Sequence, residues 1–187
     1  WDLSGSLRSA LQAVMKQDGA LAAVNFCHDE APKIAAAVSE RHGVRVGRTA
    51  LRHRSEANAP NEWQLPVLED FQARFESGQA VAELSSLQRD GLPQDITLRA
   101  MRGIPLEPQC QSCHGSEIAP ELAEAIAQRY PGDLATGFAT GDLRIEGGDP
   151  LEAADRWDHG RAIHLARNVD KWLIAREAVP FLLNSGD

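Results

Sequence analysis

The five residues from Cys110 to His114 have the sequence Cys-Gln-Ser-Cys-His and form a Cys-x-x-Cys-His motif. Two thiols at this spacing lie about one helical turn apart, so both can form thioether bonds with the vinyl groups of one porphyrin. The adjacent His114 then supplies an imidazole nitrogen as an axial ligand of the iron. The motif therefore predicts one covalently bound haem c, attached through Cys110 and Cys113.

Two other uses of these cysteines have to be compared with haem attachment. A redox disulfide between Cys110 and Cys113 belongs at a helix start after a buried strand, and the polar residues 106–109 do not resemble such a strand. A structural zinc site needs four Cys or His ligands. The chain has no second Cys-x-x-Cys or His-x-x-x-His pair, although His159 and His164 lie five residues apart. Haem attachment is therefore the favoured chemistry.

The composition is typical of a globular domain. The chain has 187 residues, of which 43% are hydrophobic and 25% are charged, and its formal net charge is −8. An acidic balance disfavours nucleic acid as a partner, because nucleic acid needs a basic face. The sequence has no apolar run of roughly 18 residues, so we expect no membrane span.

The expected location follows from the expected chemistry. Covalent haem attachment normally takes place outside the bacterial cytoplasmic membrane, so we expect a periplasmic or otherwise extracytoplasmic protein. The sequence begins at Trp1, without an initiator methionine or a signal peptide. We expect either that the natural precursor carried a signal peptide or an anchor, or that the sequence was shortened. An odd cysteine in an exported protein needs an explanation, and here that cysteine is Cys27.

The spacing of apolar residues predicts an N-terminal helical segment followed by mixed strands and helices. Gly19 is expected to interrupt the first helical stretch, Gly43 to end another helix and Asn61 to cap a third. Helices are expected over residues 3–17, 20–28, 31–41, 62–77, 120–130 and 151–178, and strands over residues 44–51, 80–87, 97–104 and 142–145.

This order of elements predicts an α+β fold. The haem motif follows several strands, whereas most small c-type cytochromes are helical and carry the motif near the N-terminus. Residues 147–150, Gly-Gly-Asp-Pro, indicate a boundary. We therefore expect a haem-binding domain over residues 1–144 and a helical C-terminal extension over residues 145–187, which could form a homodimer contact.

The second axial ligand of the iron is less clear from the residues. Cys27 is a candidate because it is not needed for haem attachment, but a buried free cysteine is the commoner explanation. His28 and Met101 are further candidates. The remaining histidines are expected to lie at helix ends, in loops or on the surface: His42, His53, His159 and His164.

Several segments of the chain have to be considered together: residues 25–35, 43–49, 58–63, 110–115, 130–138 and 141–144. In combination they resemble a bacterial and cyanobacterial family of c-type haem proteins with a PAS-like α+β fold. The resemblance covers roughly residues 20–144 and is more specific than any single motif.

This resemblance implies a five-stranded antiparallel sheet flanked by helices, with the haem beside the sheet. It also implies His/Cys axial ligation, in which His114 and Cys27 are the iron ligands. The sequence departs from the family pattern at Ala50, where Ser is common, and at Ile145, where Gly is common.

Other residues are candidates for the haem pocket on chemical grounds. Arg48, Arg52 and Arg54 alternate along an expected strand and could bind the anionic propionates, although a solvated strand face explains them as well. Trp63 and Tyr130 could wall the porphyrin, and packing in the protein core is the alternative.

The leading functional hypothesis is an extracytoplasmic domain that senses redox state or a small ligand such as NO or CO. A thiolate that leaves the iron on reduction would suit that role. The alternatives are a low-potential electron-transfer cytochrome and a haem enzyme, although we find no clear distal acid or base for catalysis. Beyond haem, the expected partners are a redox protein or a signalling domain.

Overall fold

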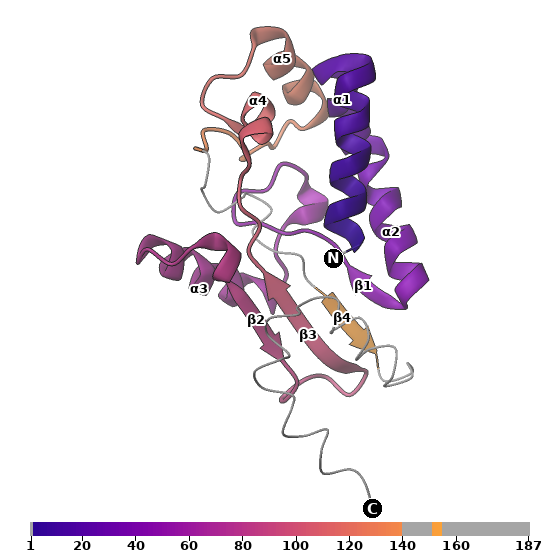
Figure 1. Cartoon of the computed structure of the whole chain (residues 1–187). Helices are drawn as coiled ribbons and strands as arrows, with labels where there is room; N and C mark the ends of the chain where they lie inside the picture. Colours follow the sequence, from indigo (N-terminus) through magenta and orange to yellow (C-terminus); the bar gives the residue numbers. More distant parts are fainter. Residues whose placement is uncertain (1, 140–150, 155–187) are drawn as a thin grey trace, which may run out of the picture.

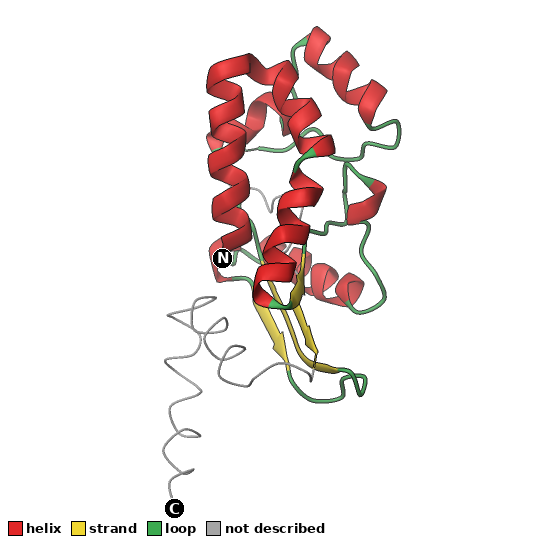
Figure 2. Ribbon diagram, turned by 90° about the vertical axis from the view of Figure 1, so that its right-hand side faces the viewer, coloured by secondary structure: helices red, strands yellow, loops and turns green. Residues whose placement is uncertain are grey.

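The computed structural model describes residues 2–139 and 151–154. The fold is α+β: an antiparallel sheet lies at one end of the molecule and helices flank it and extend beyond it (Figures 1 and 2). The helices are α1 (Asp2–Asp29), α2 (Ala31–His42), α3 (Gln64–Glu76), α4 (Gln111–His114) and α5 (Pro120–Arg129). The strands are β1 (Val44–Val46), β2 (Ser85–Gln88), β3 (Ile96–Arg102) and β4 (Leu151–Ala154), and three single 3₁₀ turns are η1 (Glu56–Asn58), η2 (Val81–Glu83) and η3 (Pro108–Cys110).

The N-terminal helical segment is confirmed. The interruption expected at Gly19 is confirmed: its φ of 84° and ψ of −178° are not helical, and α1 consists of two helical stretches that meet at this kink. α2 begins with a proline in its first turn and ends at Gly43, whose φ of 64° is left-handed. The two helices lie side by side and bury Leu3 and Leu7 of α1 against Ala31 and Val38 of α2.

The four strands form one antiparallel sheet in the order β1-β4-β3-β2. β4 lies between β1 and β3, so that Glu152 pairs with Arg45 on one side and with Arg99 on the other. β2 pairs with β3, with Ser86 opposite Met101. The resemblance implied five strands, and the strand expected over residues 142–145 lies outside the described residues.

Two of the predicted strands are shorter than expected. The strand expected over residues 44–51 ends at Val46, because the chain then turns and the hydroxyl of Thr49 donates to the carbonyl of Asn58 over 3.0 Å. The strand expected over residues 80–87 begins only at Ser85, since η2 precedes it. η2 packs closely against Gly103, the residue after β3. A Cβ at Gly103 would lie 2.6 Å from the carbonyl oxygen of Val81.

The expected helix over residues 151–178 is wrong for its first four residues, which form β4. Leu, Glu and Ala favour helices locally, but pairing with strands on both sides overrides this preference. β4 also follows the boundary expected at residue 144, so the sheet uses residues from both sides of it. Residues 155–178, including His159 and His164, lie outside the described residues, and the homodimer contact stays a prediction.

The buried core beside the sheet is formed by α3, η2, β2 and β3. α3 begins at Gln64, two residues later than expected, with Trp63 directly before it. Asn61 still bonds to its first residue: its side-chain oxygen accepts from the backbone N–H of Gln64 over 3.2 Å, and the Gln64 side chain accepts from the N–H of Asn61 over 3.0 Å. The core cluster consists of Leu68, Phe71, Val81, Leu84 and Met101, none more than 4% exposed. In the part of the chain that the structure describes, no helix is long and apolar enough to span a bilayer.

Candidate functional site

The Cys-x-x-Cys-His motif lies on η3 and α4, which follow directly on each other at the end of the molecule away from the sheet (Figure 1). The helical turn places Cys110 and Cys113 three residues apart on one side, and no disulfide joins them. Gly115 ends α4, and its N–H donates to the carbonyl of Gln111 over 2.8 Å. A Cβ at Gly115 would lie 2.6 Å from that same oxygen, so only glycine fits here.

A backbone carbonyl oxygen lies against the imidazole of His114. Its Nδ1 lies 3.0 Å from the carbonyl oxygen of Ala135. A carbonyl can only accept, so Nδ1 carries the proton and the lone pair lies on Nε2. The chain after α5 is also bonded to the backbone of the motif, because the N–H of Phe138 donates to the carbonyl of His114 over 3.0 Å.

A buried ion pair connects this segment to the motif. Nη2 of Arg54 donates to the carbonyl of Cys113 over 2.7 Å and to that of Ala135 over 3.1 Å, and Nε donates to Oδ2 of Asp133 over 3.1 Å. Oδ1 of Asp133 accepts the N–H of Ala135 over 2.7 Å. Both charged side chains are only 10% exposed. Arg54 and Asp133 therefore fix the carbonyl that orients His114.

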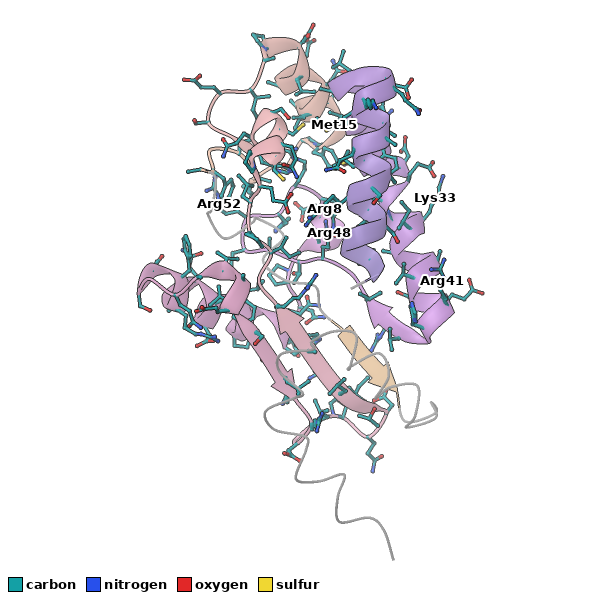
Figure 3. All side chains as sticks on the ribbon, in the orientation of Figure 1. Arg8, Met15, Lys33, Arg41, Arg48 and Arg52 are labelled. Atoms are coloured by element: carbon teal, nitrogen blue, oxygen red, sulfur yellow. The ribbon has the colours of Figure 1, made fainter. Side chains whose placement is uncertain are left out.

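The other two arginines predicted for the pocket do not form a strand face with Arg54, because their segment is a loop. Arg52 donates to the carbonyls of Leu134, over 3.0 Å, and of Thr136, and its guanidinium lies 4.0 Å from the ring centre of Phe138. Figure 3 shows Arg52 below α4. Arg48 comes from the same loop and is half-buried. Binding of propionates by Arg48 and Arg52 stays a prediction.

An apolar cluster brings the C-terminal half of α1 to the motif. Its buried members are Val24, Leu122, Ile126 and Tyr130, and Cys113 packs against it. Cys27 and His28 follow Val24 by three and four residues, so they lie on the same face of α1, one turn further on. The structure thus brings the segment of Cys27 together with the segment of Cys113, and iron ligation by Cys27 stays a prediction.

Tyr130 lies between these two sides of the site. Its ring is 5.4 Å from that of His28 in an edge-on arrangement, and the guanidinium of Arg54 lies 6.0 Å from its centre. Nδ1 of His28 contacts Oδ1 of Asp29 over 2.6 Å, and this bond is the main cause that lowers the pKa of Asp29.

The thiol of Cys113 is kept in its neutral form. Burial raises its pKa, and the contact with the Ser112 hydroxyl and the positive charge of Arg54 offset only part of this effect. In the described part of the chain, no group of three or more His, Cys, Asp or Glu side chains is arranged to hold a metal ion.

Trp63 and Met101, which the sequence offered as haem-pocket and iron-ligand candidates, lie in the core beside the sheet and not at the motif. Trp63 packs against the core cluster beside the sheet, with the guanidinium of Arg99 5.1 Å from its ring centre. Met101 is 1% exposed in the same cluster. His42 ends α2, and Nε2 of His53 lies 3.5 Å from Glu56. The structure does not bring Trp63 or Met101 together with Cys113.

The roles of Asp133 and Ala135 were not found from the sequence, and Arg54 was considered only for propionates. The turn-forming residues 130–133, Tyr-Pro-Gly-Asp, are a local signal that Asp133 bonds to a nearby N–H. No local signal indicates that Arg54 pairs with a residue 79 positions later.

The fold and the site define an α+β protein that carries two thiols and an oriented imidazole on the consecutive elements η3 and α4. A sequence profile of the Tll0287-like family matches residues 4–145. The chain therefore belongs to the Tll0287-like family.

A solved structure agrees in fold. The crystal structure of the cyanobacterial heme-protein Tll0287 is similar to the chain with a TM-score of 0.53 and 24% sequence identity, over 68% of this chain and 71% of that one. None of the curated proteins compared with the chain is similar to it.

Proposed function

We propose that this chain carries one covalently bound haem c, with Cys110 and Cys113 as the thioether residues and His114 as an axial ligand. The orientation of His114 is the main support, because the bond from Nδ1 to Ala135 leaves the lone pair on Nε2. The solved structure that shares the fold is that of a cyanobacterial heme-protein, which agrees with this proposal.

The donor set fits such a group. Two thiols that are not joined by a disulfide face one side of a helical turn, and the raised pKa of Cys113 favours a neutral thiol over a metal-binding thiolate. When bound, haem supplies an iron that changes between ferric and ferrous states and can bind a small ligand. The protein's own residues orient the imidazole through Ala135 and close the turn at Gly115.

We propose Cys27 as the second axial ligand. The support is the family resemblance together with the position of Cys27, one turn after Val24, whose side chain packs in the same cluster as Cys113. His28 is the alternative on the same face of α1. A thiolate ligand would stabilise the ferric state and lower the reduction potential.

The function supported best is an extracytoplasmic redox or small-ligand sensor with a PAS-like frame. Its two proposed ligands come from α1 and α4, which are far apart in sequence, so loss of one ligand would remove one link between these helices and leave the apolar cluster around Val24. The localisation is proposed from the covalent attachment, which requires export. An electron-transfer cytochrome would use the same ligands without such a release.

The attachment is tested on the full chain exported from a bacterium that matures c-type cytochromes. We expect haem to remain on the polypeptide after denaturation in gels, and the alkaline pyridine spectrum to be that of a haem with two thioether bonds. Haem that separates from the denatured chain would refute covalent binding, and holoprotein formed only in the cytoplasm would refute the proposed location.

The second ligand is tested with Cys27→Ser, and His28→Gln is the matched variant on the neighbouring residue. We expect the low-spin thiolate signals in the absorption and EPR spectra to disappear in Cys27→Ser and to persist in His28→Gln. A wild-type spectrum without thiolate signals that changes in His28→Gln and not in Cys27→Ser would assign the ligand to His28. Unchanged spectra in both variants would refute a ligand from this segment of α1.

Sensing and electron transfer differ in the ferrous protein. A sensor is expected to bind CO or NO on reduction and to change the exposure of α1 to proteolysis or hydrogen exchange. A ferrous protein that stays six-coordinate with these gases, and exchanges electrons rapidly with a cytochrome, would instead establish the carrier.

A further inference from the structure

We infer that Arg54 and Asp133 form a charge pair that positions His114 and sets the electrostatic environment of its imidazole. The inference rests on the proposed function, since it concerns the axial ligand of a bound haem. Arg54 is a positioning residue in this sense, because it bonds the backbone carbonyls of Ala135 and Cys113 and not the imidazole itself.

The geometry gives one oxygen two donors. The carbonyl of Ala135 accepts from Nδ1 of His114 over 3.0 Å and from Nη2 of Arg54 over 3.1 Å. A carbonyl oxygen has two lone pairs, so it can accept both bonds. The N–H of the same residue donates to Asp133 over 2.7 Å. The peptide group of Ala135 is thus held from both sides by the charge pair.

The two charges have opposite effects on the imidazole. The guanidinium withdraws electron density from the shared carbonyl, so this oxygen attracts the Nδ1 proton less and the imidazole keeps little imidazolate character. The carboxylate of Asp133 counters that charge, because Nε of Arg54 donates to Oδ2 over 3.1 Å. Electron donation from the axial histidine controls the stability of ferric iron. The reduction potential of the bound haem therefore depends on both charges: the guanidinium of Arg54 raises it and the carboxylate of Asp133 lowers it.

Burial makes this balance effective. Each side chain of the pair is 10% exposed, so solvent screens the charges little. Arg54 also donates to the carbonyl of Cys113 over 2.7 Å, which joins the pair to α4 itself. Each partner left alone would be a buried, uncompensated charge.

The test is the midpoint potential of the full, haem-loaded protein together with its unfolding free energy. We expect Arg54→Gln to lower the potential and Asp133→Asn to raise it, each by roughly a tenfold change in the ferric–ferrous equilibrium constant, which is about 59 mV for one electron. Both single variants are expected to be less stable than the wild type. The double variant is expected to return close to the wild-type potential.

Two further variants separate charge from shape. Arg54→Lys keeps the charge but not the fork of donors, so we expect a potential nearer to the wild type than that of Arg54→Gln. Arg74→Gln removes the same charge on α3, where the side chain bonds Gln79 over 2.9 Å and Asp70 over 3.0 Å. It is expected to shift the potential much less than Arg54→Gln.

Shifts of the same sign in Arg54→Gln and Asp133→Asn would overturn the inference, because loss of packing alone acts in one direction. An equal shift in Arg74→Gln would also overturn it. If the wild-type chain carries no covalent haem, the proposed function fails. The interaction between Arg54 and Asp133 is then tested by a double-mutant cycle of unfolding free energies. A coupling free energy of zero between Arg54 and Asp133 in that cycle would refute their role in positioning His114 as well.

Discussion

Two parts of the molecule are held together in different ways. In the sheet region, which consists of α3, η2, β2 and β3, five apolar side chains form a closed core in which Phe71 is fully buried. In the motif region, which consists of α4, α5, the C-terminal half of α1 and residues 130–138, a smaller apolar cluster lies beside a buried ion pair between Arg54 and Asp133. That pair bonds mainly to backbone carbonyls.

This difference indicates that the two regions have different roles in the protein. Apolar contacts are non-directional and supply stability in proportion to the area buried. Buried charged hydrogen bonds are costly to desolvate but fix geometry. The sheet region therefore supplies the stability of the fold, and the motif region fixes the orientation of His114. Substitutions in the two regions should separate stability from the properties of the site.

The largest expected effect is in the motif region. Replacement of both Cys110 and Cys113 by Ala should abolish covalent haem completely, because no thioether bond can then form. Haem staining of the denatured polypeptide measures this effect. Cys27→Ser is the control, because it removes one thiol outside the motif, and it should keep the covalent haem. If it loses haem too, the attachment does not depend on the motif alone.

The next effect concerns the sheet. A chain that ends at residue 145 lacks β4, so β1 loses its partner and β3 keeps only β2. Unpaired edges promote aggregation, and we expect loss of cooperative unfolding, measured by circular dichroism and light scattering. A chain that ends at Ala154 keeps all four strands and serves as the control. Equal stability of the two chains would show that β4 is dispensable and would support the boundary expected at residue 144.

A smaller effect is expected for Phe71→Ala in the sheet region. A large buried aromatic side chain replaced by Ala typically costs about 3–5 kcal/mol of unfolding free energy, and Phe71 is 0% exposed. Chemical denaturation measures the loss. The absorption spectrum of the holoprotein should not change, since Phe71 belongs to the core beside the sheet; a shifted spectrum would mean that the two regions are coupled. Phe71→Leu is the matched control, with a smaller loss.

The parts of the fold that could be predicted are those with local signals. The ends of α2 follow from Pro32 and Gly43, whose backbone preferences need no distant partner. The start of α3 follows from the reciprocal bonds between Asn61 and Gln64. β4 could not be predicted in this way, since its four residues favour a helix and become a strand only between β1 and β3.

The same distinction holds for the site. The thiols and the imidazole of the motif are neighbours in sequence, so their chemistry could be predicted from residues 110–114 alone. The oxygen that orients His114 lies 21 residues later, and the arginine bonded to that oxygen lies 81 residues before it. Such contacts depend on the tertiary fold. Arg54 therefore looked like a strand residue, and its bonds to Cys113 and Ala135 could not be foreseen.

The smallest effect tests the burial of the motif region before haem is attached. Burial raises the pKa of the Cys113 thiol, so the folded chain with free thiols holds less thiolate at neutral pH than the unfolded chain. Since the thiolate is the nucleophile, Cys113 should be alkylated more slowly in the folded chain than in denaturant, with a rate that rises to higher pH. Mass spectrometry of each cysteine measures these rates.

The sign of the matching stability effect follows from the same shift. A thiol whose pKa is raised by folding contributes stability below its ordinary pKa, and this contribution is lost as the pH rises through the folded value. The thiol form of the chain should therefore lose stability in alkaline solution, and Cys113→Ala should lose less. Equal alkylation rates in folded and denatured protein would show that Cys113 is as accessible as an unfolded thiol. The motif region would then close around Val24 and Tyr130 only after haem attachment, whereas the sheet region would already be packed.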